Sequence, residues 1–268
     1  MYDFTYRRPR SVKEAEEFLR TSFEPQLLAG GMSLLPSMKV RLSAPSTLVD
    51  LSDLSELKRV KVENGQLEIG AMIRHFNVLT DAKVIELIPG LSELASGIAD
   101  HQVRYRGTIG GSMANADPAA DYPAAALALN AEFITNHRRI SCDDFFLGMF
   151  TNALDESEIL CRISFRIPLA SCYIKIPHPS SGYAMTGAFV AKYEDGYQIG
   201  VTGAASTYFR HCDMEIALNN GAKANECLKI AAPDNDYISD IHASAAYRQN
   251  LVRVVIANAI EKLHSLDS

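Results

Sequence analysis

Two loops with paired glycines constrain this chain more than any other feature of its sequence. Residues 104–123 read R-Y-R-G-T-I-G-G-S-M-A-N-A-D-P-A-A-D-Y-P, and residues 27–36 read L-L-A-G-G-M-S-L-L-P. Glycine has no Cβ, so its backbone can adopt positive φ and lie close to a flat or anionic ligand. Each loop runs into a predicted helix, which Ser33 caps in one case and Asp121 in the other. Because a helix start favours an anion, the loops predict a binding surface for a phosphate-bearing cofactor.

A single Gly-Gly pair is equally well explained as a tight turn between a strand and a helix. Two such loops, roughly 80 residues apart, instead favour one extended dinucleotide held between two lobes. Neither loop has the G-x-G-x-x-G fingerprint or the G-K-[ST] ending of a P-loop, which disfavours both of those nucleotide-binding folds. The short side chains of Thr108, Ser112 and Asn115 would add polar contacts without filling the space that a ligand needs.

Longer motifs extend over nearly the whole chain. They read A-G-G-M-S-L-L-P-S-M-K-V-R-L (29–42), L-V-D-L (48–51), I-G-A-M (69–72), Q-V-R-Y-R-G-T-I-G-G-S-M-A-N-A-D-P-A-A-D-Y-P-A (102–124), Y-I-K-I-P-H-P-S-S-G-Y-A (173–184) and I-H-A-S-A-A-Y-R (241–248). These segments resemble the FAD-binding medium subunit of the molybdenum hydroxylases, the enzymes of the xanthine dehydrogenase and aerobic carbon monoxide dehydrogenase type. The resemblance implies an α+β fold (mixed α/β), with a two-lobed FAD-binding domain of the PCMH type and a small C-terminal domain of antiparallel sheet and helices.

The same resemblance implies a set of FAD-binding residues. The two glycine loops would hold the pyrophosphate and nearby groups, and Asp121 would meet hydroxyls of the ribityl or ribose part. Lys175 and Tyr183 would lie near the isoalloxazine, where a cation favours reduced flavin. The complete set is Ala29, Gly30, Gly31, Met32, Ser33, Leu34, Thr108, Ile109, Gly110, Gly111, Ser112, Asn115, Asp121, Lys175 and Tyr183.

By resemblance, the chain is the electron-transfer subunit of a heteromeric molybdenum hydroxylase. Electrons would leave a molybdenum cofactor on a large subunit, cross [2Fe-2S] clusters on a small subunit, reach this FAD and pass to an external acceptor. The acceptor is left open between NAD, a quinone, oxygen and a carrier protein, and the substrate is left open because another chain would select it. Two alternatives are a free-standing FAD-dependent oxidoreductase with its own small substrate, and a binding module that keeps the fold without the cofactor.

The apolar patterns divide the chain into three expected domains. Residues 1–57 alternate strands and helices, which predicts a largely parallel sheet. Residues 58–168 begin with a hairpin and end with a clear strand that stops at Pro168. Residues 169–268 read as an antiparallel sheet followed by helices, the last of which repeats apolar residues at helical spacing.

Short signals place several of these elements. Ser11 and Glu14 form the pattern of a capping box before the first helix. Asn64-Gly65 is typical of a type I′ hairpin turn. The helix after the first glycine loop is expected to run from Leu34 to Leu42.

Composition excludes several classes of function. The net charge of −6 and pI near 5.7 argue against non-specific nucleic-acid binding. The first ten residues lack the apolar core of a signal peptide, and no apolar run approaches the roughly 20 residues of a membrane span, so we expect a cytoplasmic protein without a membrane span.

The reactive side chains give no sign of a metal site or a catalytic centre. The five cysteines contain no C-x-x-C pair and none of the seven histidines has metal-binding spacing, so no metal site is expected. Ser33 and Ser112 lack a nucleophile elbow. Asp117 reads as part of a turn and Asp121 as a cap, so no catalytic residue is expected in this chain.

Overall fold

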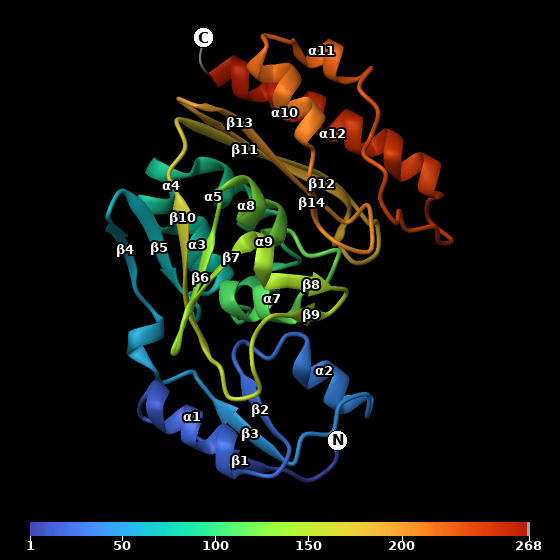
Figure 1. Cartoon of the computed structure of the whole chain (residues 1–268). Helices are drawn as coiled ribbons and strands as arrows, with labels where there is room; N and C mark the ends of the chain where they lie inside the picture. The colour runs from blue at the N-terminus through green and yellow to red at the C-terminus, as the bar shows by residue number, and fades with distance from the viewer. Residues whose placement is uncertain (267–268) are drawn as a thin grey trace.

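The computed structural model describes residues 1–266. Three main sheets follow one another along the length of the molecule, from the N-terminal end to the C-terminal helices (Figure 1). The sheets contain segments that are consecutive in the sequence, so each sheet corresponds to one stretch of the chain. Helices pack between the second and third sheets (Figure 1).

The first sheet is small and parallel. Its strands, in spatial order, are β1 (Thr5–Arg7), β3 (Thr47–Asp50) and β2 (Pro25–Leu28). Both strand pairs are parallel, as the alternation of strands and helices predicted. Helix α1 (Val12–Thr21) begins at Ser11, whose side chain accepts a hydrogen bond from the Glu14 N–H at 3.2 Å. Ala15 and Leu19 of this helix pack in the same apolar cluster as Val49 of the sheet.

Helix α2 (Leu34–Lys39) follows the first glycine loop and is shorter than predicted. It ends where Arg41 adopts a left-handed conformation with φ 64°. The Arg41 N–H donates to the Met38 carbonyl at 3.1 Å, and the Leu42 N–H donates to the Ser37 carbonyl at 2.9 Å. These two bonds form a Schellman motif, which satisfies the last carbonyls and stops the helix.

The second sheet is antiparallel throughout. Its strands, in spatial order, are β4 (Val60–Glu63), β5 (Gln66–Gly70), β10 (Leu160–Arg166), β6 (Glu132–Thr135) and β7 (Arg139–Ser141). Asn64 and Gly65 both have positive φ, 51° and 74°, which confirms the predicted type I′ turn. A 3₁₀ turn at Ser55–Leu57 leads into this sheet.

Seven short helices and a small hairpin belong to the same stretch. They are α3 (His75–Thr80), α4 (Ala82–Leu87), α5 (Pro89–Ser96), α6 (His101–Arg104), α7 (Ile109–Asn115), α8 (Tyr122–Ala128), α9 (Cys142–Phe145) and the hairpin of β8 (Phe146–Gly148) and β9 (Thr151–Asn152). Helix α8 is buried along its whole length. It therefore forms the centre of the largest apolar cluster, between the second and third sheets.

The third sheet is antiparallel and has helices on its outer face (Figure 1). Its strands are β11 (Ala170–Pro177), β12 (Ala184–Tyr193), β13 (Gly196–Thr202) and β14 (Phe209–Arg210). The helices of the same stretch are α10 (Cys212–Asn219), α11 (Ala224–Cys227) and α12 (Ala245–Leu266). Alternate residues of β12 face opposite ways. Ala188 and Val190 pack with α12, whereas Phe189 and Ala191 join the cluster around α8.

The predicted α+β class is confirmed by this arrangement of open sheets and helices. Within residues 1–266, no helix combines the length and the apolar character needed to cross a bilayer.

Candidate cofactor site

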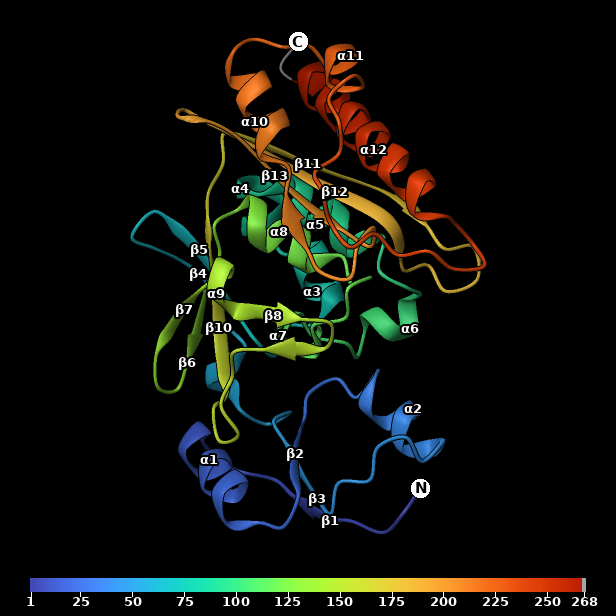
Figure 2. The same cartoon turned by 45° about the vertical axis from the view of Figure 1, so that its right-hand side comes forward.

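The two glycine loops lie against each other, although they are distant in the sequence. A methyl group at Gly30 would lie 2.2 Å from the carbonyl oxygen of Arg106 and 2.7 Å from Cα of Gly107. A methyl at Gly111 would lie 3.4 Å from Cβ of Ala29. Figure 2 shows the helices that follow, α2 and α7, on either side of the boundary between the first and second sheets. The structure thus brings the predicted loops together, and glycine permits the close approach.

The first loop offers unpaired backbone donors. Across the described part of the chain, the N–H groups from Gly30 to Leu34 donate to no protein acceptor. Met32 and Ser33 are exposed, Leu34 and Ala29 are half-buried, and Gly31 has a φ of +73°. Ser33 occupies the N-cap position of α2, but its side chain makes no capping bond, so that part of the prediction is wrong. Its backbone is in the α region rather than the extended conformation that a cap requires.

The second loop is itself the start of a helix. Thr108 caps α7, because its Oγ1 accepts a hydrogen bond from the Gly111 N–H at 3.1 Å. Ile109 and Gly110 are buried, and their N–H groups donate to the carbonyls of Ile73 and Ala71 at 3.0 and 2.9 Å. The glycines of this loop do not use the positive φ that glycine permits. Gly110 is required by tight packing instead, because a methyl there would lie 2.4 Å from Cβ of Ala71.

Polar side chains on α7 remain free. Within residues 1–266, the hydroxyl of Ser112 and the amide of Asn115 have no protein partner, and both residues are half-buried. These two groups can donate to or accept from a ligand beside the loops.

Asp121 lies at the first turn of α8 but does not cap it, so the predicted capping role is wrong. Its carboxylate is turned toward the third sheet, where it accepts from the hydroxyl of Tyr173 and from Nζ of Lys175, the latter at 3.0 Å. Asp121 is buried, and burial raises the pKa of its carboxyl group, while Lys175 and Tyr173 oppose that shift. The group is therefore a buried structural link as well as a predicted ligand.

Lys175 has three acceptors for its ammonium group. Besides Asp121, Nζ donates to the carbonyls of Gly97 at 2.9 Å and Gly182 at 2.8 Å. Its side chain is 10% exposed. Tyr183 follows on the same hairpin and is 43% exposed, and its pKa is raised by partial burial and by the nearby carboxylates. Lys175 thus fixes a positive charge where the third sheet meets the second stretch of the chain.

Sequence reasoning missed two buried polar residues near the candidate site, Tyr173 and His75. Tyr173 falls in the stretch predicted to form an antiparallel sheet, and its bond to Asp121 depends on how that sheet packs. His75 lies at the start of α3, is 5% exposed, and its Nδ1 is 3.1 Å from Oη of Tyr122. No spacing in the sequence connects these residues, so no local signal could have found them.

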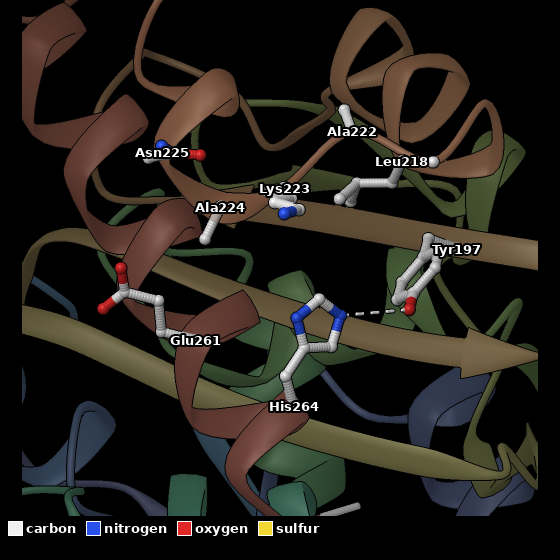
Figure 3. Close-up of a pocket in the computed structure, with 9 residues that line it drawn as sticks. Tyr197, Leu218, Ala222, Lys223, Ala224, Asn225, Glu261 and His264 are labelled. Carbon is white, nitrogen blue, oxygen red and sulfur yellow. Dashed lines mark hydrogen bonds between the residues drawn. The ribbon is translucent and has the colours of Figure 1, made fainter.

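Two hollows in the described part of the chain lie away from the glycine loops. One of about 710 Å³ lies among β13, α11 and the end of α12, where Tyr197, Lys223, Glu261 and His264 line it (Figure 3). A smaller one of about 140 Å³ lies beside β5 and is lined by charged side chains such as Arg162. None of the predicted FAD residues lines either hollow. The candidate site therefore rests on the chemistry of the loops: free N–H donors, free polar side chains and a nearby fixed positive charge fit an extended anionic dinucleotide.

Comparison with known proteins agrees with that chemistry. The family described as the FAD binding domain in molybdopterin dehydrogenase matches residues 2–170. The nicotine 6-hydroxylase medium subunit of Paenarthrobacter nicotinovorans is 32% identical over 95% of both chains. The carbon monoxide dehydrogenase medium chain of Hydrogenophaga pseudoflava is 32% identical over 96% of both chains.

Solved structures give the same result for the fold. A chain in the crystal structure of quinoline 2-oxidoreductase from Pseudomonas putida 86 superposes with a TM-score of 0.92 at 29% identity, over 98% of this chain and 97% of that one. The similarity therefore includes the third sheet and its helices, beyond the part that the family description covers. This chain belongs to the family of FAD-binding domains in molybdopterin dehydrogenases, and within it to the FAD-binding medium subunits of the molybdenum hydroxylases.

Proposed function

We propose that this subunit holds FAD across the two glycine loops and relays electrons from the iron–sulfur clusters of a partner subunit to an external acceptor. The observation that carries the proposal is the run of free N–H groups from Gly30 to Leu34, directly beside Arg106 and Gly107. Backbone donors without a protein acceptor are suited to an anion, here the pyrophosphate. Ser33, Ser112 and Asn115 would donate to the same part of the cofactor.

The remaining proposed contacts come from beyond the loops. Asp121 would accept from a hydroxyl of the cofactor with the lone pairs that Tyr173 and Lys175 leave free. Lys175 already donates to three acceptors, so we assign it an electrostatic role near the isoalloxazine rather than a direct bond. Tyr183, which is partly exposed on the same hairpin, would cover the edge of the ring.

The names of the relatives support the proposed partners. Bound FAD supplies the redox chemistry, and the residues of this chain bind and orient it. Similar proteins are named medium subunits or medium chains, which supports one larger and one smaller partner. We propose that these carry the molybdenum cofactor and the [2Fe-2S] clusters, in the cytoplasm, where the five free cysteines stay reduced.

The first test is the cofactor itself. The purified chain, loaded with FAD, should be yellow, and acid should release all of the colour as unmodified FAD, because neither loop carries a His or Cys that could bond the flavin. Failure to bind FAD would refute the proposed function as a whole. Colour retained on the denatured chain would contradict non-covalent binding.

The second test separates a relay from a free-standing flavoenzyme. The FAD-loaded chain is mixed anaerobically with a panel of aldehydes and N-heterocycles, and bleaching of the flavin absorbance is followed. We expect no bleaching with the chain alone, and bleaching once a molybdenum subunit and an iron–sulfur subunit are added. Rapid bleaching of the chain alone would instead establish an oxidoreductase that acts on its own substrate.

A further inference from the structure

We propose that His75 is a positioning residue for FAD: its imidazole supports the second glycine loop from behind and fixes how far that loop stands from the cofactor. The inference rests on the proposed function, since it concerns how the same site is built. His75 would not touch FAD. It would act through Gly107, whose lack of a side chain is then explained by the imidazole rather than by the cofactor.

The contact between His75 and Gly107 is very close. A methyl group at Gly107 would lie 2.5 Å from Nε2 of His75 and 2.7 Å from its Cδ2. Real Cβ atoms do not approach other atoms so closely, so the ring occupies the space where a side chain at position 107 would project. The backbone of His75 also donates to the Gly107 carbonyl at 3.0 Å. Ring and backbone together hold one residue of the loop from the same side.

The imidazole is itself held in place. Its Nδ1 lies 3.1 Å from Oη of Tyr122, and the two ring centroids are 5.4 Å apart. Tyr122 is fully buried in the first turn of α8, and burial keeps its pKa well above the ordinary value, so its hydroxyl retains the proton. We therefore assign the Tyr122 O–H as donor to Nδ1, which leaves the ring proton on Nε2, the nitrogen that faces Gly107.

The surroundings keep the ring neutral. Burial, and to a smaller extent the positive charge of Arg104, together lower the pKa of His75 to about 4. Arg104 is fixed by hydrogen bonds from its guanidinium to the carbonyls of Ile98 and Ala99, at 2.6 and 2.9 Å. A neutral ring can pack against a glycine Cα without the cost of burying a charge.

The contacts of His75 and Gly107 reach both glycine loops. Ile109 N–H and Gly110 N–H bond to the segment that leads into His75, so the support extends to the start of α7. Gly107 Cα is in turn the atom that a methyl at Gly30 would meet at 2.7 Å. A shift of the imidazole would therefore be transmitted to both glycine loops, which in the proposed function contact the pyrophosphate.

A double-mutant cycle tests this arrangement. FAD is titrated into cofactor-free wild type, His75→Ala, Gly107→Ala and the double variant, with the dissociation constant and the shape of the bound flavin spectrum as readouts. Gly107→Ala should weaken binding on the order of tenfold, because the methyl must displace the ring. In the double variant the methyl occupies the vacated space, so binding should return to within about threefold of His75→Ala alone.

A variant that keeps the bulk of the ring provides the matched comparison. His75→Gln fills most of the same space as the imidazole. Gly107→Ala should therefore still weaken FAD binding when it is made in a His75→Gln background. Gly148→Ala, where an added methyl meets nothing within 4 Å, is the control for a glycine substitution as such. A cycle in which the effects of His75→Ala and Gly107→Ala simply add would overturn the proposal, because Gly107 would then face the cofactor. Wild type that fails to bind FAD would refute the proposed function instead.

Discussion

Gly30 and Gly31 are adjacent in the chain but are required for different reasons. Gly31 has a φ of +73°, which L side chains rarely adopt. Gly30 has an ordinary backbone conformation, but the carbonyl of Arg106 occupies the place of a side chain. The first requirement is local, whereas the second appears only when two distant loops meet. A Gly-Gly motif therefore combines one constraint of the backbone with one of tertiary packing.

Gly30→Ala should separate the loops. The added methyl would lie 2.2 Å from a backbone carbonyl that cannot rotate away, so the two loops must move apart. We expect FAD to bind at least about tenfold more weakly, a loss of about 1.4 kcal/mol. Fluorescence titration of FAD measures this, with Gly148→Ala as control. Equal affinity in Gly30→Ala would show that the contact between the loops is not needed for the cofactor.

His75 should make the stability of the protein sensitive to acid. Its pKa is about 4 in the folded protein and 6.5 in its ordinary state, because burial and then Arg104 disfavour the charged ring. As the pH falls, His75 takes up a proton in the unfolded chain before it does so in the folded protein. The stability that depends on a neutral His75 is therefore fully present above about pH 6.5 and is lost as the pH falls toward 4. The loss attributable to this residue is about 3 kcal/mol. Urea denaturation of wild type and His75→Gln between pH 7 and 4 measures the difference, and parallel pH profiles would contradict the assignment.

At the level of elements, helix α7 connects the second loop to the core. It begins at Thr108, and its first N–H groups are taken up by Thr108 itself and by the residues after β5. The loop therefore has less freedom than a flexible glycine turn. Helix α2 differs, since the N–H groups before it are free and its own end is closed by a Schellman motif. The loop before α2 is therefore suited to bind an anion, and the loop at the start of α7 is suited to form a rigid support beside it.

Loss of the α7 cap should loosen that support. Thr108→Ala removes the hydroxyl that accepts from the Gly111 N–H and should lower the free energy of unfolding by about 1 kcal/mol. FAD should dissociate faster, because the start of the helix is less well fixed. Thr108→Ser keeps the hydroxyl and should retain most of the stability and the affinity. Denaturant titration and stopped-flow release of FAD provide the two measurements, and a Ser variant as defective as Ala would exclude the cap as the cause.

For the whole molecule, ion pairs tie the third sheet and its helices to the preceding part, and two of them differ clearly in burial. Lys175 and Asp121 form the buried pair, with side chains 10% and 5% exposed. Lys262 and Glu93 form an exposed pair between α12 and α5, at 2.7 Å. The two pairs join the same parts of the protein, so they allow a direct comparison of buried and exposed charges.

Lys175→Met should destabilise the protein much more than Lys262→Met. The first change leaves a carboxylate buried without its cation, at a cost of about 3–5 kcal/mol. The second removes an exposed pair and should cost at most about 1 kcal/mol. Adding Asp121→Asn to Lys175→Met should recover part of the loss. Thermal or urea unfolding tests this, and equal effects of the two lysine variants would show that the Lys175–Asp121 link contributes no more than a surface pair.

The sequence by itself determined the class of the fold, most of its elements and the family. The parallel order of the first sheet, the type I′ turn at Asn64-Gly65 and the long last helix all follow from local patterns, because hydrophobic periodicity and turn chemistry depend on near neighbours. The tertiary structure alone decided what the polar residues do. Asp121 looked like a cap in its local sequence, yet its carboxylate pairs with Tyr173 and Lys175, more than fifty residues away. The same holds for Gly30 and Gly107, whose small size is required by atoms from distant segments. Such contacts depend on how sheets and helices pack, which no local pattern encodes.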